Sequence, residues 1–267
     1  MDAPYQASQD VFVLPTNLPL PGAGVVLPIN AYVLLADEPV LVDAGIGVDS
    51  DDFVDAVASI VDLDALRWVW LTHDDADHTG SLRRILEAAP NARLVTHAFN
   101  ALRMATWWPV PFDRVHAIRP GDRVPVGDRT LRAVRPPLFD NPMSIGLLDE
   151  ATGSLFSVDS FGALLPEVTQ DAAEVPHEAL AGGMAGWAMA DSPWAHLVDR
   201  DRFAEVLAGV RSLHPERIFS SHLPAASGTS LERFLEVLTS VPDAEPVLPP
   251  NHEEFGHMLA AMLAPTG

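Results

Sequence analysis

The feature that most constrains this chain is a short segment rich in metal-binding side chains, placed directly after an apolar stretch. Residues 71–80 read Leu-Thr-His-Asp-Asp-Ala-Asp-His-Thr-Gly, so two imidazoles and three carboxylates fall within residues 73–78. The preceding residues 68–71 are typical of a buried strand, and the final Thr-Gly predicts a tight turn into a helix. Two nitrogen donors and several oxygen donors suit zinc, iron or manganese. We therefore expect a metal site at the end of a strand.

The composition limits the classes of protein to consider. With 267 residues, 48% of them apolar, the chain can form one large α/β domain or two small ones. Its net charge of -21 argues against binding to nucleic acid or to anionic lipid surfaces. Because there is no cysteine, disulfides, thiolate metal sites and a built-in rubredoxin-type iron centre are excluded. The N-terminus has no signal-peptide pattern and no apolar run reaches about 18 residues, which predicts a cytoplasmic protein without a membrane span.

The order of secondary structure favours two sheets packed face to face with helices outside. Strands are expected over residues 11–14, 31–35, 40–42, 68–71, 93–96, 124–126, 130–134, 155–158 and 218–221. Helices are expected over residues 52–61, 81–89, 199–213 and 230–238. The Pro-rich stretch 242–250 predicts a linker into a short terminal helix over 253–263.

The motif at 73–78 resembles that of the metallo-β-lactamase superfamily, whose signature is His-x-His-x-Asp-His at the end of a strand. Within it, the chain most resembles the flavodiiron and oxygen-binding di-iron branch. That branch carries His-x-Glu-x-Asp-His, followed by Ser-Gly-Ser-Leu and, after a helix, Ala-Pro-x-Ala. Here residues 73–82 read His-Asp-Asp-Ala-Asp-His-Thr-Gly-Ser-Leu, and residues 89–92 read Ala-Pro-Asn-Ala.

Later segments agree with the same branch. Residues 155–162, Leu-Phe-Ser-Val-Asp-Ser-Phe-Gly, resemble its Leu-Phe-Ser-x-Asp-Ala-Phe-Gly, whose Asp bridges two metals. Residues 220–224, Ser-Ser-His-Leu-Pro, resemble its Pro-Ser-His-Gly-Pro, which supplies the last His, and Asp43 matches an early Asp that supports the site from beneath. The resemblance covers roughly residues 10 to 240 in order and includes nothing like a flavodoxin domain. It implies an α/β fold, a four-layer αββα sandwich of the metallo-β-lactamase type over residues 1–241, followed by a linker and short helix over 242–267.

Carried over residue by residue, the resemblance implies a two-metal site. One metal would be held by His73, Asp75 and Asp159, and the other by Asp77, His78, Asp159 and His222. Asp77 would also be the catalytic residue. The expected cofactors are two metal ions, iron first, with zinc, manganese or a single metal as alternatives.

Two positions depart from the branch. The branch has a His before its Trp-Pro-Asp-Ser-Met segment, and the matching residue here is Leu138, which cannot bind a metal. Asp75 stands where the branch has Glu, so its reach is shorter. The first metal therefore lacks a ligand unless Asp140, His116 or water supplies one. Because carboxylate replaces imidazole, the site favours a harder ion such as iron or manganese over zinc.

These features leave three functions open. The first is a di-iron oxidoreductase that binds or reduces O2 or NO with electrons from a separate partner protein. The second is a metallo-hydrolase of a lactone, thioester or related acyl substrate, in which a metal lowers the pKa of water and Asp77 orients the resulting hydroxide. The third, motivated by Leu138, is a non-enzymatic sensor or binding protein with a degenerate site. We favour the first function, and the resemblance allows a homodimer.

Overall fold

The computed structural model describes residues 1–20 and 22–263. Its strands are β1 (Tyr5–Gln6), β2 (Val11–Leu20), β3 (Val25–Leu34), β4 (Val40–Val42), β5 (Trp68–Trp70), β6 (Arg93–His97), β7 (Val115–Ile118), β8 (Arg123–Pro125), β9 (Thr130–Val134), β10 (Gly146–Asp149), β11 (Ser154–Phe156), β12 (Arg217–Phe219) and β13 (Ala226–Ser227). Its α-helices are α1 (Ser50–Ile60), α2 (Ala76–Thr79), α3 (Leu82–Ala88), α4 (Ala98–Met104), α5 (His177–Asp191), α6 (Arg200–Arg211), α7 (Leu231–Ser240) and α8 (His252–Leu263).

The strands of the described residues form two mixed sheets. The first has the order β1-β2-β3-β4-β5-β6-β7, and the second has the order β13-β12-β11-β10-β9-β8. Strands β4 to β7 pair in parallel, and so do β11 and β12. Because the carboxyl ends of parallel neighbours lie at one edge of a sheet, the loops that follow these strands meet there.

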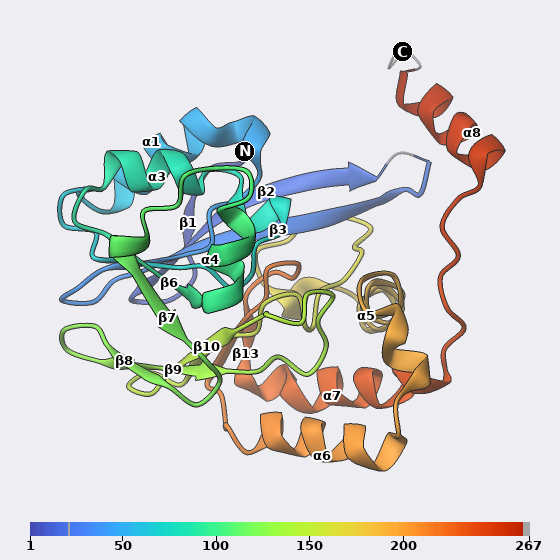
Figure 1. The fold of residues 1–267 in the computed structure, drawn as a ribbon. Helices are drawn as coiled ribbons and strands as arrows, with labels where there is room; N and C mark the ends of the chain where they lie inside the picture. Colours follow the sequence, from blue (N-terminus) through green and yellow to red (C-terminus); the bar gives the residue numbers. More distant parts are fainter. Residues whose placement is uncertain (21, 264–267) are drawn as a thin grey trace.

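Buried apolar side chains separate the layers. Side chains of both sheets, among them Val42, Trp70, Phe156 and Phe219, pack together between the sheets. Helices α1 and α3 cover the outer face of the first sheet, and α5, α6 and α7 cover the outer face of the second. Figure 1 shows this order from the α1 and α3 side to the α6 and α7 side. The predicted αββα sandwich is confirmed.

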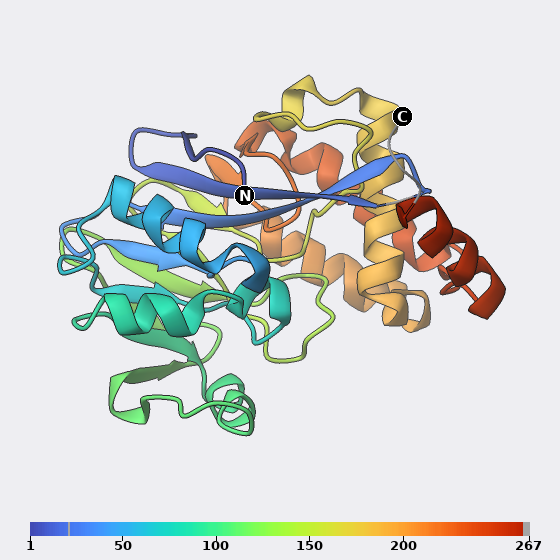
Figure 2. The same ribbon diagram turned by 90° about the horizontal axis from the view of Figure 1, so that it is seen from above.

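The long hairpin of β2 and β3 was only partly expected from the sequence, and the long helix α5 was not expected. Strands β2 and β3 pair along all ten residues of each strand, so the hairpin reaches across the molecule towards α5 (Figure 2). Helix α5 was not predicted, because its own apolar and small residues lie on all of its sides and form no apolar stripe at helical spacing. Its side chains Leu180, Met184 and Ala188 are buried against the second sheet and its neighbouring helices.

The C-terminal segment follows the sequence expectation in outline. A 3-10 helix over Val241–Asp243 ends α7, and residues 244–251 run without helix or strand to α8 (Figure 1). The division at residues 241 and 242 stays a prediction. In the described part of the chain, none of the helices is long and apolar enough to cross a membrane.

One buried ion pair joins the two sheets. Arg129, between β8 and β9, donates from Nη1 to Asp10 Oδ2 at 2.6 Å and to Asp149 Oδ2 at 3.0 Å. Asp10 precedes β2 of the first sheet, and Asp149 ends β10 of the second. Asp149 is fully buried, and the Arg129 guanidinium is the cation that pairs with it.

We predict that Arg129→Ala lowers the free energy of unfolding by about 3 kcal/mol, because it leaves the buried carboxylate of Asp149 uncompensated. Urea denaturation at neutral pH measures the change. Arg119→Ala is the control, since the Arg119 pair with Asp122 is exposed. Its effect should stay within about 0.5 kcal/mol. Equal effects of the two substitutions would contradict the structural role of Arg129.

Candidate metal centre

The candidate ligands come from loops that follow strands of both sheets. The segment with His73 to His78 follows β5, Asp159 follows β11, and His222 follows β12. The last two loops are joined backbone to backbone, because the Ser221 N–H donates to the Val158 carbonyl at 2.9 Å. All six residues predicted as metal ligands therefore lie at one edge of the sandwich. Whether each binds a metal stays a prediction.

The backbone around the centre is strained. Asp43, Val158 and Phe161 have φ angles of 60°, 58° and 67°, in the left-handed region that glycine prefers. For a β-branched residue such as Val158 this conformation is a genuine outlier, and each such residue costs about 1–3 kcal/mol. Val158 and Phe161 flank Asp159, so the surrounding structure fixes the direction of that carboxylate at the expense of local stability.

The donors expected for the second metal, Asp77, His78, Asp159 and His222, have the spacing of a tetrahedral metal site. We call this group the second position. His78 Nε2 lies 3.3 Å from Asp77 Oδ2 and 3.2 Å from Asp159 Oδ1. His222 Nε2 lies 3.4 Å from Asp77 Oδ2 and 3.1 Å from Asp159 Oδ1. Donors that share one ion through bonds of about 2.1 Å in a tetrahedron lie about 3.4 Å apart. This second position therefore fits a metal ion without rearrangement.

The donors expected for the first metal face the other oxygen of Asp159. We call this group the first position. His73 Nε2 lies 3.4 Å from Asp159 Oδ2 and 3.8 Å from Asp140 Oδ1. His73, Asp75 and Asp140 place one donor atom each within 4.8 Å of one another. Asp159 thus presents Oδ1 to one group and Oδ2 to the other, the arrangement expected of a carboxylate that spans two ions. The structure brings Asp140 to this first position, whereas His116 lies on β7 and packs against Trp68.

The state of Asp159 tests whether these residues fit a metal. Its side chain is 2% exposed, yet neither carboxylate oxygen has a hydrogen-bond partner among the described residues. The imidazole nitrogens of His73, His78 and His222 approach these oxygens without hydrogen-bond geometry. Leaving a buried carboxylate without hydrogen bonds is costly. Donors that face common points but do not bond to one another fit a bound cation.

The pKa values report the crowding of negative charge. Burial, followed by the charge of Asp159, raises the pKa of Asp140 to about 8 and that of Asp191 to about 7. Burial also raises the pKa of Asp77, but the imidazoles of His78 and His222 outweigh it and hold that pKa well below its usual range. A bound cation would favour the ionised form of every carboxylate here.

Hydrogen bonds behind the centre orient the imidazoles. Asp43 accepts from the Thr72 N–H at 2.8 Å and from the Thr72 hydroxyl at 2.9 Å, and its Oδ2 lies 2.9 Å from His78 Nδ1. His222 Nδ1 lies 2.8 Å from the Pro28 carbonyl. These contacts hold Nδ1 of both rings behind the centre and direct Nε2 towards the cluster, where its lone pair would serve a metal.

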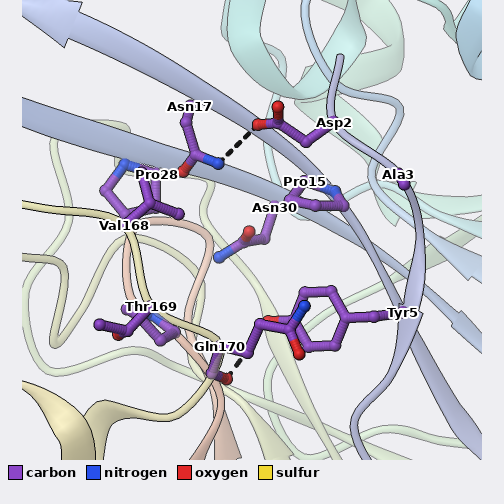
Figure 3. A pocket seen from close by; sticks show the side chains of 11 residues that line it. Asp2, Ala3, Tyr5, Pro15, Asn17, Pro28, Asn30, Val168, Thr169 and Gln170 are labelled. Atoms are coloured by element: carbon purple, nitrogen blue, oxygen red, sulfur yellow. Dashed lines mark hydrogen bonds between the residues drawn. The ribbon is translucent and has the colours of Figure 1, made fainter.

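A separate cavity of about 270 Å³ is lined by residues that include Pro28 and Pro224, and by none of the six predicted ligands. Figure 3 shows Asn30 between the wall that carries Asp2 and Asn17 and the wall that carries Gln170. Asn30 Nδ2 donates to the Leu223 carbonyl at 2.9 Å, next to His222. The cavity therefore adjoins the backbone next to His222 and lies outside the cluster of ligand side chains.

The structure also adds residues that sequence reasoning missed. Asn141 Nδ2 donates to Asp74 at 2.8 Å and to Asp75 at 2.9 Å, so it ties the loop with Asp140 to the motif. Asp74 faces away from the cluster and pairs with Arg103 at 3.0 Å. Asp191, the last residue of α5, places a donor atom within 4.8 Å of donors from Asp140 and Asp159. No local motif marks Asp191, because it comes from a helix that the sequence did not predict.

Comparison with known proteins places the chain in a family. A family model described as "ODP family beta lactamase" matches residues 27–222, which include all six predicted ligands. The chain belongs to this ODP family. The resemblance inferred from the order of the sequence motifs is therefore confirmed.

Other proteins resemble parts of this ODP-family chain. An Enterobacter protein named anaerobic nitric oxide reductase flavorubredoxin is 28% identical over 136 residues, which cover 50% of this chain and 28% of that protein. The solved rubredoxin oxygen:oxidoreductase of Desulfovibrio gigas has a TM-score of 0.76 at 16% identity, over 91% of this chain and 62% of that one. The flavodiiron protein of Giardia intestinalis gives 0.77 at 15% identity, over 91% and 60%. At such identities the solved structures show a shared fold, and each match covers less than two thirds of the relative.

The support from Asp43 generates a prediction. Asp43→Asn should weaken metal binding about 10- to 100-fold, because His78 loses the charged partner that orients its ring. Asn tolerates the left-handed backbone at this position, so the fold should persist. Competition with a chromogenic chelator measures the affinity. Asp113→Asn, at an exposed residue, is the matched control, and an unchanged affinity in Asp43→Asn would contradict the role of Asp43.

Proposed function

We propose that this chain is a di-iron protein that binds or reduces O2 or NO, with electrons supplied by a separate partner protein. The observation that carries the proposal is the Asp159 carboxylate, whose two buried oxygens each face a different group of His and Asp donors. Membership of the ODP family supports it. Relatives named nitric oxide reductase and oxygen:oxidoreductase also support it.

The donor set suits iron. Asp77, His78 and His222 would hold one ion with Asp159 Oδ1, and His73 and Asp75 would hold the other with Asp159 Oδ2. When bound, iron supplies electrons and an open coordination position for a diatomic ligand. Carboxylate-rich ligation with few imidazoles favours iron or manganese over zinc.

The surroundings of the cluster favour a small ligand over a bulky one. His73, His78 and His222 are each 1% exposed, whereas the side chains of Asp77 and Asp140 are about a third exposed. The partly exposed carboxylates of the cluster therefore lie between these imidazoles and the solvent. A diatomic molecule can pass between these carboxylates more readily than an acyl substrate can place its carbonyl behind them.

Trp187 closes another side of the centre. Its ring packs on His222 with centroids 4.5 Å apart, and its indole N–H donates to the Asp159 carbonyl at 3.1 Å. Gly162 makes room for this packing, since a Cβ there would lie 2.5 Å from Trp187 Nε1. The indole thereby excludes water from the ring of His222 and fixes the backbone of Asp159.

A metallo-hydrolase of a lactone, thioester or related acyl substrate is the second candidate. It is favoured by Asp77, because the imidazoles that hold its pKa well below the usual range keep this carboxylate ionised. An ionised carboxylate at this place can orient a hydroxide nucleophile. The limited access around the cluster argues against this function.

The proposal predicts two iron ions per chain after anaerobic purification with Fe(II), and an optical spectrum that changes on exposure to air. His222→Ala removes a donor of the second position and should reduce the iron content towards one. His177→Ala, at an exposed residue, should retain both ions. Elemental analysis and anaerobic absorbance measure these results.

Other outcomes of this experiment would contradict the proposal. Zinc alone, with an unchanged spectrum in air and turnover of activated esters, would favour the hydrolase. Less than one metal per chain, unaltered by His73→Ala, would favour a binding protein or sensor.

A further inference from the structure

The first metal position has a gap at Leu138. Leu138 is 3% exposed and packs in the apolar cluster outside the second sheet. Its N–H donates to Ser160 Oγ at 3.1 Å, and its carbonyl accepts from the same hydroxyl at 2.8 Å. These bonds hold residue 138 next to the segment with Asp159. The backbone is therefore beside the metal centre, but the leucine side chain offers no donor.

Two carboxylates lie near this gap. Asp140 follows two residues after Leu138, and its Oδ1 is 3.8 Å from His73 Nε2. Asp191 is the last residue of α5. Donor atoms of Asp140, Asp159 and Asp191 all lie within 4.8 Å of one another. The buried Asp159 oxygens, which have no hydrogen bond among the described residues, face this group as well as the histidines.

Asp191 occupies a place that helix electrostatics disfavours. The carboxyl end of a helix carries partial negative charge, which repels an acidic side chain there. The last turn of α5 contains no basic residue that would compensate. Asp191 Oδ2 accepts a hydrogen bond from the Ser192 hydroxyl at 3.0 Å, a neutral partner. A cation at the cluster would reverse this penalty.

We propose that Asp140 and Asp191 complete the first metal position in place of the imidazole absent at Leu138. This inference rests on the proposed function in one respect, that the chain holds two metal ions. The position then draws on two overlapping groups of donors, His73 with Asp75 and Asp140, and Asp140 with Asp159 and Asp191. Such an oxygen-rich set suits a hard divalent ion such as Fe2+ or Mn2+.

Metal-binding measurements on the 267-residue chain test this inference without relying on its activity. The metal-free protein is titrated with Mn2+, and the EPR signal of free Mn2+ reports the uptake. The unaltered chain should bind two Mn2+ ions. Asp191→Asn and Asp140→Asn should each weaken one of the two binding events at least tenfold and leave the other within about twofold.

A matched control separates ligation from a general loss of charge. Asp201→Asn removes an exposed carboxylate from the first turn of α6 and should bind both ions like the unaltered chain. Asn is well tolerated at the end of a helix, so Asp191→Asn should keep the fold, which circular dichroism checks.

The outcomes distinguish this inference from the proposed function. Two Mn2+ ions bound by Asp191→Asn with unaltered affinities would overturn the inference, even if the iron-loaded protein reacts with oxygen. One ion or none in the unaltered chain would also overturn it. Loss of one binding event in Asp191→Asn supports the inference, even if the iron-loaded protein proves inert to O2 and NO.

Discussion

Negative charge is concentrated at one edge of the sandwich. Among the described residues, the carboxylates of Asp75, Asp77, Asp140, Asp159 and Asp191 converge with three imidazoles, and Asp159 is buried without a hydrogen bond. Carboxylates this close repel one another strongly in a medium that excludes water. The raised pKa values of Asp140 and Asp191 relieve part of this repulsion, and a bound cation would relieve it further.

Strand pairing, packing of the two sheets and a strained backbone hold these charges together. Parallel pairing of β11 with β12 puts the loops of Asp159 and His222 side by side, and packing of the sheets adds the loop after β5. The left-handed backbone at Val158 directs Asp159 inward. The local sequence explains why each strand and turn forms, but the charge cluster arises only when these elements pack together.

Sequence alone predicted most of this arrangement. The order of strands indicated the sandwich, and the resemblance of three motifs to the di-iron branch implied that His73, Asp159 and His222 share one centre. Asp191 could not be predicted, since α5 has no apolar stripe and lies far from any motif. Similarly, Asp74 and Asp75 are neighbouring residues of one type, and only the structure shows that Asp74 pairs with Arg103 whereas Asp75 lies among the metal donors.

The candidate metal donors come from both halves of a chain that has no cysteine. His73 and Asp77 belong to the first sheet side, and Asp159 and His222 to the second, so a bound metal acts as a cross-link between residues far apart in sequence. Because such an ion binds the folded chain and not the unfolded one, folding and metal supply become a single equilibrium. The lifetime of the folded protein would then follow the concentration of free metal around it.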